Sequence, residues 1–209
     1  MLYSREYITE STLLGIWKTE ETRDELLSML CHHEWIQNIY SIKSESRVLE
    51  ILAARVLLKE LLGEEKEICY NSSGKPFLTD GSYHISVSHT RGYVGVALNK
   101  DKFPGLDLEQ ISGKIFRVRS RLISSHEYID RDNELIHLLL HWSAKEAMIK
   151  FLDVEGIDIR RHLFVDRFIP RQKGCFPASE SRTETHYQFD VYYRVEKDFV
   201  VVCLEANAF

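Results

Sequence analysis

The 209-residue sequence contains no apolar run near the ~20 residues that a helix needs to cross a bilayer. Residues 1–6 also lack the apolar core of a signal peptide, so we expect a cytoplasmic protein. Basic residues number 27 against 32 acidic ones, which argues against a surface built for nucleic acid. Any phosphate-binding site must therefore be local.

Paired cysteines are also missing. Cys31, Cys69, Cys175 and Cys203 are spread along the chain, without the spacing of a disulfide framework or of a Cys-x-x-Cys zinc site. The turn at residues 71–77 contains Gly74-Lys75-Pro76 but lacks the earlier Gly, and the Ser or Thr after the Lys, that a P-loop requires. These absences exclude a zinc finger and a Walker-type nucleotide site.

Hydrophobic periodicity and turn residues predict three helices and two hairpins. The helices are expected around residues 22–40, at residues 47–62 as a strongly amphipathic helix ended by Gly63, and at residues 134–152; the hairpins are expected at residues 83–98, turning at Arg91-Gly92, and at residues 187–205. Because helix then hairpin occurs in each half, we expect an α+β fold of two pseudo-symmetric lobes, 1–103 and 104–209. Each lobe would pack an antiparallel sheet against a long helix.

The third predicted helix contains a stripe of three functional side chains. Trp142, Glu146 and Lys150 are four residues apart, so they lie on one side of the helix. An exposed Glu–Lys pair beside a core Trp is the simplest interpretation of this pattern. We expect Trp142 to fix the helix against a sheet from the core.

Asp107 and Glu109 alternate with Leu106 and Leu108, so in a strand both carboxylates lie on one face. Two like charges this close repel, and a divalent cation such as Mg²⁺ is the natural counter-charge for carboxylate oxygens. A fully solvated strand end is the alternative.

Basic residues form two further candidate sites. Arg47 and Arg55 are about two turns apart on their helix, so they project from nearly the same side and can hold an anion. Ser88 and His89 fall at the tip of the first hairpin, where side chains are accessible. Residues 113–135 are the most Arg-rich stretch and suit an acidic partner. A solvated basic surface is the alternative for both Arg groups.

Four segments together resemble the 4'-phosphopantetheinyl transferase superfamily, and its long, single-chain type most closely. They are Gly74-Lys75-Pro76, Ile85-Ser86-Val87-Ser88-His89-Thr90, Gly105-Leu106-Asp107-Leu108-Glu109 and Trp142-Ser143-Ala144-Lys145-Glu146-Ala147-Met148-Ile149-Lys150. Each segment alone is weak evidence for a family. Four segments in the right order over residues 47–152 make a chance similarity improbable. The resemblance implies transfer of the phosphopantetheine arm of coenzyme A to a serine of an acyl or peptidyl carrier protein, with Mg²⁺ and release of adenosine 3',5'-bisphosphate.

The resemblance also implies roles for individual residues. Asp107, Glu109 and Glu146 match the metal ligands, and Glu146 also matches the proposed base. Lys150 matches the lysine that contacts the pyrophosphate. Together, Glu146, Lys150 and Asp107 are the expected catalytic set.

Contacts to the coenzyme are implied in the same way. The residues expected to make them are Arg47, Lys75, Ser88, His89 and Lys150, with Arg55 a looser match. Residue 108 is Leu rather than a third acid, which agrees with the long type but leaves any metal with fewer protein ligands. We expect a monomer that binds neither nucleic acid nor membrane.

Three other functions are compatible with parts of the sequence. A non-catalytic relative that binds carrier proteins or coenzyme A is disfavoured because the matched acidic and basic positions are all present. A different Mg²⁺-dependent phosphotransferase would need a Gly-rich phosphate loop. A purely structural protein would not explain a polar strip of Ser86, Ser88, Asp107 and Glu109 that the sequence pattern suggests is buried.

Overall fold

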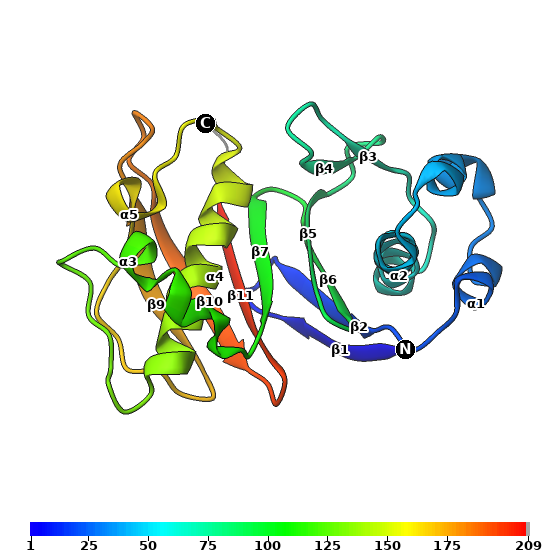
Figure 1. Cartoon of the computed structure of the whole chain (residues 1–209). Helices are drawn as coiled ribbons and strands as arrows, with labels where there is room; N and C mark the ends of the chain where they lie inside the picture. The colour runs from blue at the N-terminus through cyan, green and yellow to red at the C-terminus, as the bar shows by residue number, and fades with distance from the viewer. Residues whose placement is uncertain (208–209) are drawn as a thin grey trace. The chain divides into compact units, whose positions relative to one another are not determined.

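The computed structural model describes residues 1–207, apart from the side chain of Asn38, and the chain divides into two compact units. Unit 1 is Met1–Asp101 and unit 2 begins at Lys102, whereas the sequence suggested a boundary between residues 103 and 104. Each unit combines antiparallel strands with one long helix, so the predicted α+β class is confirmed (Figure 1). No helix within residues 1–207 is long and apolar enough to span a membrane.

Unit 1 contains a four-stranded antiparallel sheet in the order β1-β2-β6-β5 and a separate β3-β4 pair. The strands are β1 (Leu2–Tyr7), β2 (Leu13–Lys18), β3 (Ile68–Tyr70), β4 (Pro76–Leu78), β5 (His84–Thr90) and β6 (Tyr93–Asn99). The helices are α1 (Arg23–Ser28), the 3-10 helix η1 (His33–Ser41) and α2 (Glu45–Leu62). Strands β5 and β6 form the predicted hairpin, which turns at Arg91-Gly92.

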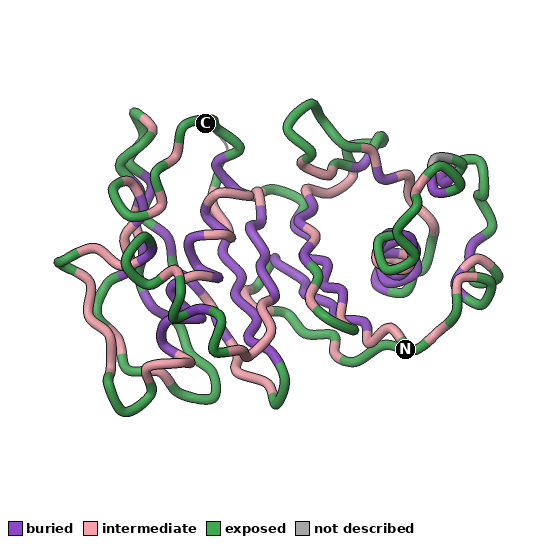
Figure 2. The backbone as a smooth tube through the Cα atoms, viewed as in Figure 1, coloured by how far each residue is buried: buried purple, intermediate pink, exposed green. Residues whose placement is uncertain are grey.

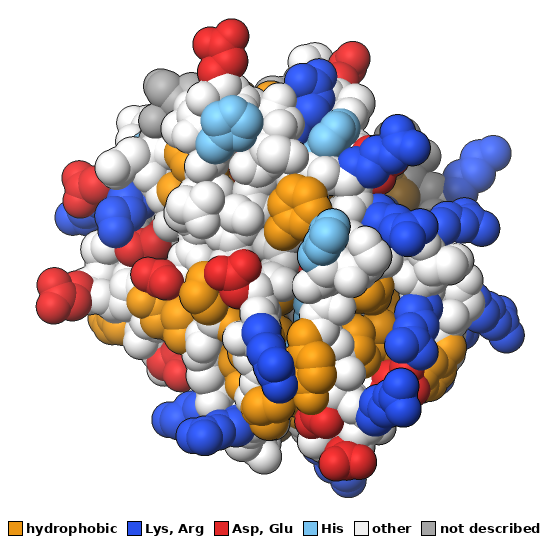
Figure 3. Space-filling view, turned by 90° about the vertical axis from the view of Figure 1, so that its left-hand side faces the viewer, with side chains coloured by type: hydrophobic (Ala, Val, Ile, Leu, Met, Phe, Trp, Pro, Cys, Tyr) orange, Lys and Arg blue, Asp and Glu red, His pale blue; other side chains and the backbone are white. Residues whose placement is uncertain are grey.

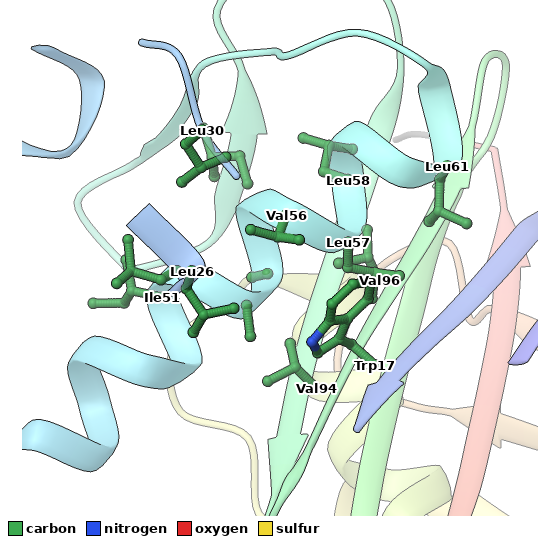
Figure 4. Close-up of a cluster of buried hydrophobic side chains, with 14 of the residues drawn as sticks. Trp17, Leu26, Leu30, Ile51, Val56, Leu57, Leu58, Leu61, Val94 and Val96 are labelled. Atoms are coloured by element: carbon green, nitrogen blue, oxygen red, sulfur yellow. The ribbon is translucent and has the colours of Figure 1, made fainter. Parts of the chain in front are cut away.

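Helix α2 forms the centre of unit 1. The Ser44 hydroxyl accepts a hydrogen bond from the Arg47 amide at its start, and Gly63 ends it in the left-handed conformation, with φ of 77°. The predicted amphipathic character is wrong, because every residue from 51 to 58 is buried. The helix contacts β2, β6 and α1, and Figure 4 shows Leu57 beside Trp17 and Val96 of the sheet. An aliphatic run of this kind is covered on all sides rather than along one stripe.

The helix predicted around residues 22–40 is interrupted. A capping box of Thr22 and Glu25 starts α1, but the chain leaves the helix after Ser28 and resumes as η1. Between them, the amides of Cys31 and His32 donate to the Glu65 carboxylate, at 2.8 and 3.0 Å. The Glu65 carboxylate, 33 or 34 residues away along the chain, therefore accepts the hydrogen bonds that a continuous helix would have made. A local sequence pattern cannot reveal a contact over this distance.

Unit 2 contains a five-stranded antiparallel sheet in the order β7-β11-β10-β9-β8. The strands are β7 (Phe103–Gln110), β8 (Leu163–Val165), β9 (Lys173–Glu180), β10 (Gln188–Val195) and β11 (Phe199–Ala206). The helices are the 3-10 helix η2 (Gly113–Arg117), α3 (Arg119–Leu122), α4 (Glu134–Leu152) and α5 (Ile159–His162). Helix α4 and the hairpin β10-β11 match the predicted elements closely. Most residues of α4 and β11 are buried, whereas β10 alternates between buried and more exposed residues (Figure 2).

Helix α4 packs against β7 and β11 at unusually short range. Gly105, Asp107 and Glu109 share one face of β7 because successive side chains alternate. A Cβ at Gly105 would stand 2.3 Å from the carbonyl oxygen of Ala147 in α4. Only a residue without a side chain allows the helix to approach so closely, and Ala147 directly follows Glu146.

Replacing Gly105 with Ala tests this contact. We expect the G105A substitution to lower the free energy of unfolding by roughly 2 kcal/mol, in the range of overpacked cores, because the helix backbone has to move away from β7. The matched control is G113A, where the nearest atom to an added Cβ is 3.8 Å away. Chemical denaturation measures both, and equal stability of G105A and wild type would contradict the contact.

Candidate functional site

Strand β7 presents two carboxylates to helix α4. Asp107 and Glu109 lie opposite Val202 and Val200 of β11, so the pairing of β7 with β11 at one edge of the sheet fixes their positions. Asp107 is buried and Glu109 is half-buried. The prediction that both carboxylates lie on one face of a strand is confirmed, but a fully solvated strand end is excluded by their burial.

The predicted stripe of α4 faces these carboxylates. Lys150 Nζ donates to Asp107 Oδ1 at 2.8 Å and to the carbonyl oxygen of Leu106 at 2.9 Å. One turn back along the helix is Glu146, and one turn further is Trp142, whose Nε1 donates to Glu109 Oε2 at 3.1 Å. The structure therefore brings Asp107, Glu109, Glu146 and Lys150 together within unit 2.

Negative charge is in excess among these four side chains. Burial raises the pKa of Glu146, and the charge of Asp107 raises it further, with Lys150 acting in the opposite direction. Burial and then Asp107 likewise raise the pKa of Glu109. The three carboxylates repel one another and so form one electrostatic group. Carboxyl groups with perturbed pKa values are typical of functional sites.

The chemistry of this donor set fits a divalent cation, because three carboxylates share one lysine. Within residues 1–207, however, no three His, Cys, Asp or Glu side chains are placed so that they could hold one ion. In this arrangement Lys150 provides the counter-charge of Asp107. A cation would have to compete with that ammonium group for the same carboxylate.

Two side-chain contacts of α4 were not predicted from the sequence. Trp142 was expected only to pack in the core, but its indole N–H also binds Glu109. Lys145 is fully buried and donates to the Glu127 carboxylate and to the carbonyl oxygen of Leu122. Burial alone would raise the pKa of Glu127, but His141 and Lys145 lower it to about 2. A buried Lys–Glu pair 18 residues apart gives no periodic signal.

A second group of polar side chains lies in unit 1. Arg47 of α2 contacts His89 of β5 through Nη1 and Nε2, which are 3.0 Å apart, and Glu50 lies within 3.4 Å of both. The three side chains are partly exposed. The hairpin and the first turn of α2 thus place a guanidinium and an imidazole side by side, an arrangement suited to a phosphate group.

Three other predicted residues stand apart from this pair. Ser88 is buried on the opposite face of β5 from His89, so the expected accessibility is wrong for Ser88. Lys75 lies in the turn between β3 and β4, near the start of β5, where its charge adds to burial in lowering the pKa of His84. Arg55 is buried and donates to the carbonyl oxygens of Ile51 and Ile68. The predicted Arg47–Arg55 anion site is therefore wrong, because Arg55 binds backbone.

Comparison with known proteins adds no assignment: no protein-family model matches the sequence, and no curated protein matches it. A functional interpretation thus depends on the side chains described above.

The raised pKa of Glu146 predicts how stability varies with pH. A carboxyl group whose pKa is higher in the folded state stabilises the fold below its ordinary value of 4.5, and this contribution is lost as pH rises through the raised pKa. We therefore expect E146Q to be more stable than wild type at pH 7 in a chelating buffer, with the difference shrinking below pH 4.5.

Urea denaturation across this pH range measures the effect. The control is E184Q, at an exposed carboxyl group of unit 2, which we expect to leave the pH profile unchanged. An E146Q protein that is less stable than wild type at pH 7 would show that the carboxylate is stabilising in its ionised form.

Proposed function

We propose that this chain transfers the 4'-phosphopantetheine group of coenzyme A to a serine of an apo acyl or peptidyl carrier protein, in a Mg²⁺-dependent reaction that releases adenosine 3',5'-bisphosphate. The observation that supports it most is the gathering of Asp107, Glu109, Glu146 and Lys150 between β7 and α4. These are the residues that the resemblance to the transferase superfamily implies for metal and pyrophosphate.

Each of these side chains has a chemical task. Glu146 accepts no hydrogen bond from the described residues, so its carboxylate is available to take the proton of a serine hydroxyl. Serine is a weak nucleophile near neutral pH, and the raised pKa of Glu146 makes it a better base. Lys150 supplies positive charge to the leaving phosphate. Asp107, Glu109 and Glu146 are the residues that would hold Mg²⁺, which would supply positive charge against the pyrophosphate.

Unit 1 supplies groups for the phosphates of coenzyme A. Arg47 and His89 form the best arranged pair, because one is a bidentate donor and the other donates when it is protonated. Glu50 holds both side chains in place, and a phosphate would compete with its carboxylate. Lys75 and Ser88 are proposed as weaker contributors, from the resemblance alone.

An acidic partner has a matching surface in unit 2. We define the basic surface as Lys114, Arg117 and Arg121, from η2 and α3, together with Arg160 and Arg161 on α5, which contacts α3. Lys and Arg side chains gather on the right of the face in Figure 3. Phe116, which is 45% exposed, adds an apolar contact. We propose that a carrier protein docks here, in the cytoplasm, on a monomeric enzyme.

The alternative is a protein that binds coenzyme A or a carrier without transferring anything. Incubating the protein with coenzyme A, Mg²⁺ and an apo carrier, and weighing the carrier by mass spectrometry, separates the two functions. Transfer adds one phosphopantetheine group. Measurable coenzyme A binding, with no mass change on any apo carrier, would favour the binding protein.

Glu146→Gln tests the proposed base. The substitution keeps the size of the side chain but removes its ability to take a proton, so we expect transfer to fall by at least about 100-fold. The fold should persist, which circular dichroism can check. In the same mass-spectrometric assay E184Q should transfer at the wild-type rate, and retained transfer by E146Q would remove Glu146 from the mechanism.

Charge reversal tests the proposed docking surface. Arg117 and Arg121 are exposed and pair with no carboxylate among the described residues, unlike Arg119, which pairs with Glu134. We expect the double variant R117E/R121E to raise the KM for the carrier at least tenfold at low salt, with the KM for coenzyme A unchanged. K173E on β9 is the control. An unchanged carrier KM would place the docking surface elsewhere.

A further inference from the structure

We propose that His137 is a pH-sensitive switch: while its ring is neutral it holds residues 128–133 against helix α4, and protonation of the ring in mild acid releases them. We call residues 128–133 the latch loop; it joins Glu127 to the start of α4 at Glu134. The switch lies within unit 2 and would operate whatever reaction the chain catalyses.

Helix α4 has a second polar stripe besides the one that faces β7. His137, His141 and Lys145 are four residues apart, and all three are fully buried. At one end of the stripe, Lys145 pairs with the Glu127 carboxylate, which also accepts a hydrogen bond from the Val165 amide at 3.0 Å. Glu127 is thus a fixed point, and the latch loop leads from it to His137 at the other end of the stripe.

The contact at His137 depends on the charge of its ring. The Asp130 amide donates to His137 Nδ1 at 2.8 Å, so Nδ1 is the unprotonated nitrogen of a neutral ring. A proton on Nδ1 would collide with the amide hydrogen, and the bond would be lost. The other nitrogen, Nε2, is buried and has no hydrogen-bond partner within residues 1–207, so it cannot compensate for a charge on the ring.

Aromatic rings enclose the His137 side chain. Phe168, in the segment after β8, contacts it edge to face with the ring centroids 4.3 Å apart, and Tyr128 of the latch loop does so at 5.9 Å. The His141 ring lies one turn further along α4, at 4.9 Å. This enclosure favours the neutral imidazole, because aromatic side chains solvate a charge poorly.

The charged groups around His137 act in opposite directions. Burial lowers the pKa of His137 from 6.5 to about 4, and the charge of His141 acts in the same direction, whereas the Asp130 carboxylate opposes both. Arg167, whose guanidinium lies 4.4 Å from the centroid of the Tyr128 ring, adds positive charge behind that ring. Protonation of the buried ring is therefore unfavourable as long as the latch loop is closed.

The direction of the pH effect follows from this difference. With the latch loop open, water reaches His137 and its pKa returns to near 6.5. The closed form is therefore fully favoured above pH 6.5, and this preference is lost as the pH falls from 6.5 toward 4. Glu127 stays ionised in this range, because its own pKa is lowered to about 2, so it continues to hold Val165.

Hydrogen exchange of the ¹⁵N-labelled full-length protein, followed by NMR, tests the switch. We expect the protection factor of the Asp130 amide to be roughly 20-fold lower at pH 5 than at pH 7, which follows from a pKa of 6.5 in the open form and about 4 in the closed form. The Val165 amide is the internal control and should keep its protection. Equal protection of the Asp130 amide at both pH values would overturn the proposal.

The variant H137N separates the proton from the hydrogen bond. Asn keeps an acceptor near the position of Nδ1 but takes up no proton, so its Asp130 amide should be equally protected at pH 5 and pH 7. H126N, at an exposed histidine beside Glu127, is the matched control and should show the pH dependence of the wild type. A wild-type pH dependence in H137N would show that another group takes up the proton, and would overturn the role of His137.

The imidazole ¹⁵N signals of the wild-type protein give a test that needs no variant to fold. At pH 7 they should show His137 as the neutral tautomer with its hydrogen on Nε2, and the ring should titrate over the same pH range in which the Asp130 amide loses protection. A hydrogen on Nδ1 at pH 7, or titration in a separate range, would contradict the switch.

Discussion

The close contact between helix α4 and strand β7 is the constraint on which the candidate site depends. It exists because Gly105 has no side chain where the carbonyl oxygen of Ala147 approaches. On the same face of the strand, the next two positions that point toward the helix are Asp107 and Glu109. The approach that the glycine permits therefore also brings both carboxylates within reach of side chains on α4.

This arrangement places acidic groups where water is partly excluded, and the pKa values of Glu109 and Glu146 rise as a result. Three acids beside one ammonium group cost the fold stability, because buried charges lose their hydration. Lys150 compensates the charge of Asp107, and Trp142 with a backbone amide orients Glu109. The residual repulsion is a cost to the fold that a bound cation would remove.

In unit 1 the charged side chains are balanced differently from those of unit 2. Glu50 accompanies Arg47 and His89, so this group is electrically paired and exposed rather than strained and buried. Such a group suits reversible binding of an anion, because the anion exchanges with a carboxylate that is already weakly held by solvent-exposed donors. The acids of unit 2 and the bases of unit 1 thus differ in burial and in how their charges are balanced.

The elements with local signals could be predicted from the sequence. Period-two alternation placed Asp107 and Glu109 on one face, and the four-residue spacing of Trp142, Glu146 and Lys150 placed them on one stripe, because backbone geometry alone sets both repeats. What those faces contact depends on how the chain folds in three dimensions. The Glu65 carboxylate interrupts the predicted first helix, backbone carbonyls take up Arg55, and Trp142 donates to Glu109. Each is a contact between residues distant in sequence or dependent on packing, which periodicity cannot encode.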